Sequence, residues 1–300
     1  MRVVVVGCGY VGLALASQLA DRGHAVTGAR RSAAGLAAIE AVGPSVDAVR
    51  ADVTDPDAVD RLPDADAVVF AASSGGGGAA AAKAVYVTGL RNVVDEYGSR
   101  ASPPDRVVYT SSTGVYGDHG GGWVDEDTPI EPVTEKTRVL AEAERVARER
   151  STDAGIDGTV VRFAGLYGPD RYRLRRYLDG PVTAGYLNMV HRADAAGAIR
   201  YLLEADAARD GVVVVVDDEP VDKHAFADWL ADACGVERPA TQSAAERIAA
   251  GDLSPAAERR VRTSKRCSNA RLRGLGYEFV HPTFRSGYRD AVRAFRAENA

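Results

Sequence analysis

The stretch Val3-Val4-Val5-Val6-Gly7-Cys8-Gly9-Tyr10-Val11-Gly12 decides the fold. Four consecutive valines predict a strand covered on both faces, as in a parallel sheet. The glycines fit G-x-G-x-x-G, and an apolar helical pattern over residues 10–22 follows at once. In that context Gly7 permits a tight turn, Gly9 lets the backbone approach a pyrophosphate, and Gly12 lets helix and strand pack closely. A glycine turn with only a structural role is the alternative.

The start of that helix predicts an anion site. Free N–H groups and the helix dipole favour negative charge at a helix N-terminus. Tyr10 and Val11, which begin the helix, are therefore expected to bind the cofactor phosphates together with the three glycines.

Strand-like and helix-like segments alternate downstream, which indicates βαβ units and a parallel sheet. We expect an α/β fold: a Rossmann-type doubly wound parallel sheet with a smaller C-terminal substrate-binding region. The dinucleotide-binding domain is predicted at 1–164, and a mixed α/β region interleaved with it at 165–300. Further strands are expected at 25–29, 46–50, 67–71, 106–110, 158–162 and 212–216, and helices at 32–41, 79–98, 136–150, 193–204, 222–234 and 282–297.

Composition excludes several classes of protein. A net charge of -5 over 300 residues argues against a nucleic-acid partner, which needs a basic face. No apolar run approaches the length of a membrane span, and no signal core is present, so we expect no membrane contact and a cytoplasmic location. The three cysteines have neither metal-site nor disulfide spacing, so no metal is predicted.

The end of the second strand predicts which nicotinamide cofactor binds. An NAD site usually carries a carboxylate there for the ribose 2′-hydroxyl. This chain has Arg30-Arg31-Ser32 instead, and guanidinium groups bind phosphate oxygens through a planar fork. The sequence therefore predicts NADP, with NAD as the alternative if the two arginines are only solvated charges.

Two further segments are expected to touch the cofactor. Asp52-Val53 follows the third strand, where a carboxylate can accept the adenine amino hydrogen, although a turn or N-cap role for Asp52 is nearly as plausible. Ala71-Ala72-Ser73 ends the fourth strand, where small side chains let the cofactor pass close to the backbone.

The chain resembles the extended short-chain dehydrogenase/reductases, in the NAD-dependent epimerase/dehydratase family. Within it, the chain is most similar to an atypical branch that lacks the Tyr-x-x-x-Lys motif. The matching segments run in the family's order over about 275 residues: Gly7–Gly12, Asp52-Val53, Asp66–Ser73, Val107–Gly117, Asp125–Pro129, Arg162-Phe163, Tyr167–Pro169, Val190-His191, Asp194, Ser264–Arg266 and Leu275–Tyr277.

The resemblance implies catalytic roles by position. It puts the family's catalytic Ser/Thr at Ser112, its tyrosine at Thr134 and its lysine at Arg138. A threonine hydroxyl is far less acidic than a phenol and transfers protons poorly at neutral pH. Arg138 is expected to supply a fixed cation to the nicotinamide ribose. Tyr116 is a candidate replacement proton donor, with Tyr86, Tyr186, His119 and His191 as others, whereas Lys136 should face elsewhere on the helix.

The segment Arg171-Tyr172-Arg173-Leu174-Arg175-Arg176-Tyr177 predicts a substrate bearing phosphate or carboxylate groups, because its guanidiniums concentrate positive charge in an acidic chain. A solvated helix face is the alternative reading. The sequence leaves the oligomeric state open, although a homodimer is common in the family.

Two functions remain open at this stage. One is an NAD(P)-dependent oxidoreductase or sugar-nucleotide epimerase/dehydratase-like enzyme with a rearranged proton donor. The other is a catalytically silent NADP(H)-binding sensor or scaffold, which the loss of both Tyr and Lys would favour.

Overall fold

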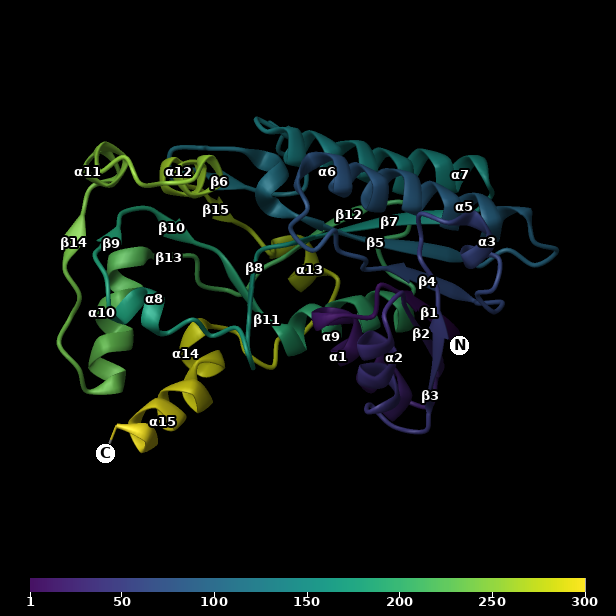
Figure 1. Cartoon of the computed structure of the whole chain (residues 1–300), viewed down its shortest axis with the longest axis horizontal. Coiled ribbons are helices and arrows are strands. Elements are labelled where there is room, and N and C mark those ends of the chain that lie inside the picture. The colour runs from purple at the N-terminus through teal and green to yellow at the C-terminus, as the bar shows by residue number, and fades with distance from the viewer. Residues whose placement is uncertain (300) are drawn as a thin grey trace.

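The computed structural model describes residues 1–299, apart from the side chains of Pro255 and Ala256. Seven parallel strands form its main sheet, in the order β12-β7-β5-β4-β1-β2-β3 (Figure 1). Chain order reverses beside β1, which is the point where parallel sheets bind ligands. The strands are β1 (Arg2–Val6), β2 (Ala25–Arg30), β3 (Val46–Arg50), β4 (Ala67–Phe70), β5 (Arg106–Ser112), β7 (Asp157–Phe163) and β12 (Val212–Val215).

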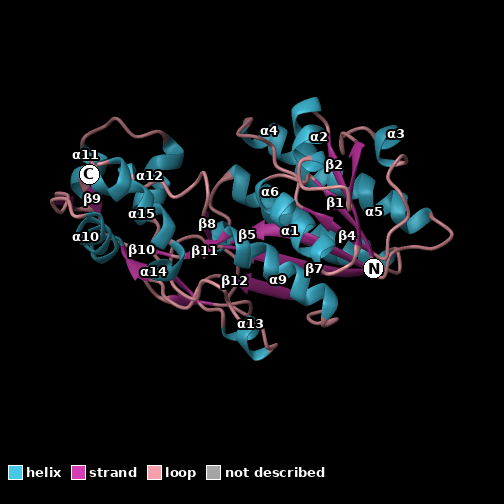
Figure 2. Ribbon diagram, turned by 90° about the horizontal axis from the view of Figure 1, so that it is seen from below, coloured by secondary structure: helices cyan, strands magenta, loops and turns pink. Residues whose placement is uncertain are grey.

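Helices cover both faces of this sheet (Figure 2). One face carries α1 (Tyr10–Asp21), α2 (Ala33–Glu40) and α9 (Arg192–Glu204). The other carries α3 (Pro56–Val59), a long helix built from α4 (Gly78–Lys83), η1 (Ala84–Gly89) and α5 (Leu90–Ser99), and a second built from α6 (Glu135–Arg145), η3 (Val146–Arg150) and α7 (Ser151–Asp153).

The valine run of β1 is explained by this sandwich. Val3 and Val5 pack with α1 and α9, and Val4 and Val6 pack with the helices of the opposite face. All four are at most 1% exposed. A strand buried on both faces carries apolar side chains on both sides, which explains the unbroken run of valines. The seven parallel strands with helices on both faces confirm the predicted Rossmann-type sheet.

The second group of elements lies beside the carboxyl ends of the sheet strands and is built from short ladders. Aromatic side chains, including Tyr167, Phe226, Phe284 and Tyr288, fill its own core. Its elements are β8 (Gly165–Tyr167), α8 (Arg175–Leu178), β9 (Val182–Thr183), β10 (Tyr186–Leu187), β11 (Met189–His191), β13 (Val221–Asp222), α10 (Lys223–Cys234), β14 (Thr241–Gln242), α11 (Ala244–Ala249), α12 (Pro255–Arg262), α14 (Phe284–Gly287) and α15 (Arg289–Glu298).

Three smaller elements connect the two groups. The 3-10 turn η2 (Thr113–Tyr116) follows β5, β6 (Trp123–Val124) pairs with β15 (Arg266–Cys267), and α13 (Ala270–Gly274) packs near β12. The prediction of a single closing helix over residues 282–297 is wrong in one respect. The segment forms two helices, α14 and α15, on either side of Tyr288.

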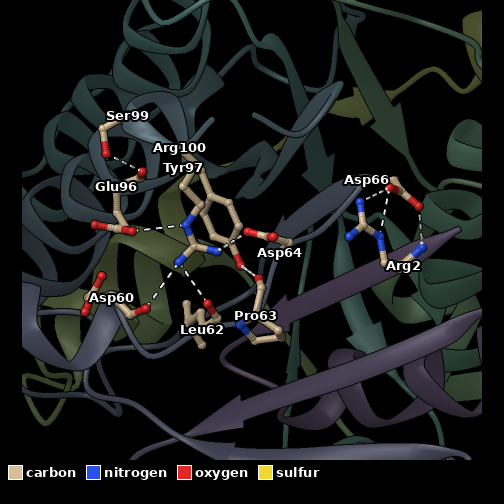
Figure 3. A network of polar contacts seen from close by, with 10 residues as sticks. All are labelled: Arg2, Asp60, Leu62, Pro63, Asp64, Asp66, Glu96, Tyr97, Ser99 and Arg100. Carbon is tan, nitrogen blue, oxygen red and sulfur yellow. Dashed lines mark hydrogen bonds and ion pairs between the residues drawn. The ribbon is translucent and has the colours of Figure 1, made fainter. Parts of the chain in front are cut away.

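A polar network fastens the amino ends of the strands (Figure 3). Arg2 pairs with Asp66 at 2.7 Å, which joins the starts of β1 and β4. Arg100 donates to Glu96 at 3.0 Å and to the Leu62 carbonyl at 2.8 Å, with its guanidinium over the Tyr97 ring. These contacts stabilise the amino-terminal edge of the sheet, which lies opposite the edge where the strands end.

A buried ion pair supports the carboxyl ends of β5 and β7. Arg162 on β7 donates to Glu144 on α6 at 2.7 Å, and both side chains are under 8% exposed. Ser111 donates to the same carboxylate at 2.5 Å, and Arg162 also donates to the Tyr116 hydroxyl at 2.8 Å. The network ties strand, helix and η2 together directly behind Ser112.

Removing the acid of this pair should destabilise the fold. Glu144→Ala leaves the Arg162 guanidinium charged and unpaired in the interior, which costs about 3–5 kcal/mol. Urea denaturation measures the change in the free energy of unfolding. The control is Glu149→Ala, whose carboxylate is 71% exposed beside Arg145 and should cost under about 0.5 kcal/mol. Equal losses in the two variants would contradict a buried ion pair here.

Candidate functional site

A cavity of about 860 Å³ opens at the carboxyl ends of the sheet strands. We call it the sheet-edge cavity. It brings together residues at or just after the carboxyl ends of β1, β2, β3, β4 and β5, which are separated by up to 105 positions in the chain, from Gly7 to Ser112. Of the residues selected from the sequence, it is lined by Gly7, Gly9, Tyr10, Val11, Arg30, Arg31, Ser32, Asp52, Val53, Ala71, Ala72, Ser73 and Ser112.

The glycine turn passes very close to β4. Gly7 has a positive φ of 78°, and a Cβ placed there would lie 2.2 Å from the Ala72 Cα. Only glycine therefore fits. Gly9 is the N-cap of α1 and has no side chain to occupy the helix end, so the first N–H groups of α1 are free for an anion. Gly12 does not line the cavity. It is buried, and a Cβ there would lie 3.1 Å from Val5.

Two arginines and a serine lie on the β2 side of the cavity. Arg30 donates to the Cys8 carbonyl at 3.1 Å, so it lies over the glycine turn. Arg31 is exposed, and Ser32 caps α2 by accepting from the Gly35 N–H at 3.2 Å. Asp52 is the one acidic side chain among the described residues that line this cavity. The carboxyl end of β2 therefore places positive charge at the cavity, and no carboxylate lies beside it on the same strand.

Asp52 has a local turn role as well as a place in the cavity. Its Oδ1 accepts from the Thr54 N–H at 3.0 Å and from the Thr54 hydroxyl at 2.8 Å. These hydrogen bonds lower the pKa of Asp52. The carboxylate is thereby held in a fixed orientation, with its second oxygen available to a ligand.

Ser112 ends β5 at the cavity. Its Oγ accepts from the Gly114 N–H at 3.1 Å, which starts η2. Because the oxygen accepts there, the hydroxyl hydrogen can be donated into the cavity.

The other three catalytic candidates lie elsewhere. Tyr116 is fully buried and does not line the sheet-edge cavity, and burial raises its pKa to about 12. Thr134 is the N-cap of α6, where it accepts from the Thr137 N–H at 3.1 Å and from Arg259 at 3.0 Å. Arg138 is exposed and does not line the sheet-edge cavity. Tyr116 and Thr134 thus make hydrogen bonds that stabilise the fold, and Arg138 lies outside the sheet-edge cavity.

Lys136 was placed wrongly by sequence reasoning. It was expected to face away, but it lines the sheet-edge cavity together with Thr137 and Leu140. Tyr86 on η1 also lines the cavity, and the charge of Lys136 contributes to lowering the pKa of its phenol. Two residues on a helix differ by about 200° in direction, so Lys136 and Arg138 cannot both face the same ligand.

A second cavity, of about 560 Å³, adjoins the first. We call it the arginine-lined cavity. The two share Gly114, Leu166, Arg171 and Arg259. No acidic side chain is among the described residues that line the second cavity, whereas eight cations do: Arg171, Arg173, Arg176, Lys223, Arg247, Arg259, Arg260 and Lys265.

These cations repel one another. Burial lowers the pKa of Arg260, and Arg176, Arg259 and Arg173 lower it further. Burial also lowers the pKa of Lys223, again with a contribution from Arg176. Such a concentration of like charge in a chain of net charge -5 is stabilised when an anion binds.

Sequence reasoning found only part of this cavity. Arg171, Arg173 and Arg176 were expected together, but Arg175 points away, over the Phe295 ring and toward Asp179. The other five cations come from later segments of the chain and were missed: Lys223, Arg247, Arg259, Arg260 and Lys265. The run Arg259-Arg260 in α12 was the available signal.

The histidine candidates lie outside both cavities. His119 is within 2.9 Å of the Tyr116 carbonyl oxygen. His191 lies with Asp194 and His281 in a group whose ligand atoms are within 4.8 Å of one another. Burial, with His281 and Arg192, lowers the pKa of His191 to about 4. The Asp194 oxygens already accept from the Val280 and His281 N–H groups, so this group holds the loop of residues 277–281 onto α9.

No helix in residues 1–299, the part that the structure describes, is both long enough and apolar enough to cross a membrane.

Comparison with known proteins gives a consistent set of relatives. Protein YeeZ of Escherichia coli strain K12 is 32% identical over 243 residues, which cover 79% of this chain and 85% of YeeZ. A solved Methylobacillus flagellatus structure, provisionally assigned as an NAD-dependent epimerase/dehydratase, is 32% identical, with a TM-score of 0.77 and 98% of each chain covered. Human epimerase family protein SDR39U1, crystallised with NADPH, has the same fold, with a TM-score of 0.75, 20% identity and coverage of 98% and 99%.

The sequence model of the NAD dependent epimerase/dehydratase family matches residues 3–217, more than half of the chain. Its span runs from the second residue of β1 to just beyond β12, and so includes the glycine turn, Ser112 and all seven strands of the central sheet. The chain therefore belongs to the NAD-dependent epimerase/dehydratase family.

Proposed function

We propose that this protein is an NADP(H)-dependent oxidoreductase or epimerase/dehydratase-type enzyme acting on a small anionic substrate. One observation carries the proposal: a cavity with a dinucleotide-binding turn adjoins a cavity whose described charged side chains are all cationic. Ser112 lines the first cavity, and Thr113 and Gly114 lead into the second.

The residues of the sheet-edge cavity fit a nicotinamide dinucleotide. The turn at Gly7 and Gly9 and the free N–H groups of α1 suit the pyrophosphate, and Ala71, Ala72 and Ser73 leave room beside β4. Arg31 and Ser32 suit a 2′-phosphate. The NADPH in the human relative supports this cofactor class. When bound, the nicotinamide gives or takes a hydride.

Two side chains would orient the reacting groups. Ser112 can donate a hydrogen bond to the substrate oxygen, because its Oγ already accepts from Gly114. Lys136 lines the cavity and can supply the cation that the sequence had assigned to Arg138. Its ammonium has three donors for the ribose hydroxyls.

The arginine-lined cavity supports a substrate with phosphate or carboxylate groups. Arg173, Arg176 and Arg260 make no ion pair within the described part of the chain. Unpaired guanidiniums suit carboxylate and phosphate groups, because each guanidinium can donate two parallel N–H bonds to a pair of their oxygens.

Cofactor preference can be measured directly. NADPH should bind more tightly than NADH, and Arg31→Ala should weaken NADPH binding about tenfold, the equivalent of one charged hydrogen bond, while leaving NADH binding unchanged. Fluorescence titration gives both dissociation constants. Arg61→Ala, an exposed arginine outside the cavity, controls for net charge. A clear preference for NADH would defeat the NADP assignment.

Anion binding can be tested with inorganic pyrophosphate. It should bind with an affinity that falls as ionic strength rises, and Arg176→Ala and Arg260→Ala should each weaken it about tenfold. Isothermal titration calorimetry measures the affinity. Arg289→Ala, on α15 and outside both cavities, should leave it intact. The proposal fails if pyrophosphate does not bind, or if the control loses as much as the two cavity variants.

Turnover separates an enzyme from a silent cofactor-binding protein. With NADPH and a panel of phosphorylated aldehydes, ketones and nucleotide sugars, we expect cofactor oxidation that falls about 100-fold or more in Ser112→Ala. Absorbance of the reduced nicotinamide follows the reaction. Tight NADPH binding without turnover across the panel would favour the sensor or scaffold.

A further inference from the structure

The phenol of Tyr86 faces the sheet-edge cavity with an unusual set of partners. Tyr86 lies in η1, a π-helical segment inside the long helix that packs beside β4. The residue is 9% exposed and lines the cavity. Its oxygen accepts from the Ser74 N–H and from the Ser74 hydroxyl, both at 3.3 Å. π-helical segments often occur at functional sites, because the extra residue redirects a side chain.

Ser74 supplies both hydrogen bonds that the structure gives the Tyr86 oxygen, and none within residues 1–299 is donated by the Tyr86 hydroxyl. The Tyr86 hydrogen can therefore be offered to a ligand. Tyr10, the other tyrosine lining this cavity, donates its hydrogen to the Pro169 carbonyl at 3.0 Å. Tyr86 is thus the tyrosine here that can both donate a proton to a ligand and have its oxygen anion held by donors already in place.

Electrostatics act in the same direction. Burial raises the pKa of Tyr86, but the hydrogen bonds from Ser74 and Ser73 and the charge of Lys136 outweigh burial, so the net pKa lies below its ordinary value. The buried tyrosines nearby behave in the opposite way, since burial raises the pKa of both Tyr109 and Tyr116. A proton donor must have a pKa near the working pH to act efficiently.

We propose that Tyr86 is the proton-transfer residue of this site and that Lys136 is its positioning cation. This inference rests on the proposed function. It assigns to η1 the role that the family resemblance would place at Thr134, a residue that the structure engages as a helix cap.

The proposed step balances in the reducing direction. The Tyr86 O–H bond breaks as the substrate's carbonyl oxygen takes the proton and becomes a hydroxyl. NADPH, held at the glycine turn of the sheet-edge cavity, would supply the hydride that joins the carbonyl carbon and would become NADP⁺. The Tyr86 phenolate is held by the two Ser74 donors and by the Lys136 charge, and it regains its proton from water. Ser112 donates to the same carbonyl oxygen and so aligns it.

The first test needs no substrate. The ultraviolet absorbance of phenolate is titrated against pH in the wild type, Tyr86→Phe, Lys136→Gln and Tyr201→Phe. Tyr201 is the matched control, because its hydroxyl binds the Leu275 carbonyl outside both cavities. We expect one phenol to ionise below the ordinary pKa of about 10, to vanish in Tyr86→Phe alone, and to ionise at higher pH in Lys136→Gln.

The second test uses the panel compound that the wild type reduces fastest. Tyr86→Phe should lower kcat about 10²–10⁴-fold while its NADPH dissociation constant stays that of the wild type. The fall in rate at high pH should move to higher pH in Lys136→Gln, because loss of the ammonium raises the pKa of the donor.

The outcomes separate this inference from the proposed function. If the wild type does not bind NADPH, the proposed function fails whatever Tyr86 does. If NADPH binds normally but Tyr86 ionises at or above its ordinary pKa, or Tyr86→Phe keeps the wild-type rate, Tyr86 is not the proton donor and only this inference is overturned.

Discussion

The contact between the first turn and β4 is the constraint on which the site depends. A side chain at residue 7 would collide with the backbone of Ala72, so this turn can close only with glycine. Its closure places the N-terminus of α1 at the carboxyl edge of the sheet, beside the ends of β2 and β4. Arg31, Ser73 and Ser112 then meet around one cavity because each follows a parallel strand to the same edge.

The fold was largely predictable because its signals are local. A valine run, a glycine turn and alternating segments each depend on residues within about 20 positions. The doubly wound parallel sheet followed from the alternation of strands and helices and from the family resemblance. The break at Tyr288, in contrast, lies in the aromatic core of the second group, whose partners come from distant segments.

The site was harder to predict for a physical reason. Aligning Thr134 and Arg138 with a Tyr-x-x-x-Lys motif assumes that both face the ligand. Thr134 instead makes the hydrogen bonds of a capping box at the start of α6. In this helix Lys136 lies against the sheet-edge cavity, and Arg138 is exposed outside it. Arg259 and Arg260 line the arginine-lined cavity from α12, far along the chain from Arg171–Arg176. Their sequence shows two adjacent charges but does not show that these charges meet the earlier arginines. The site therefore depends on the three-dimensional positions of the helix cap, the side chains of α6 and the arginines of α12.

A crystal structure with NADP⁺ and inorganic pyrophosphate tests the central claim most directly. The account predicts the 2′-phosphate on Arg31 and Ser32, the nicotinamide ring between Ser112 and Tyr86, and pyrophosphate among the guanidiniums of Arg173, Arg176 and Arg260. A nicotinamide ring bound away from Ser112 and Tyr86, with Thr134 or Arg138 beside it instead, would contradict the account.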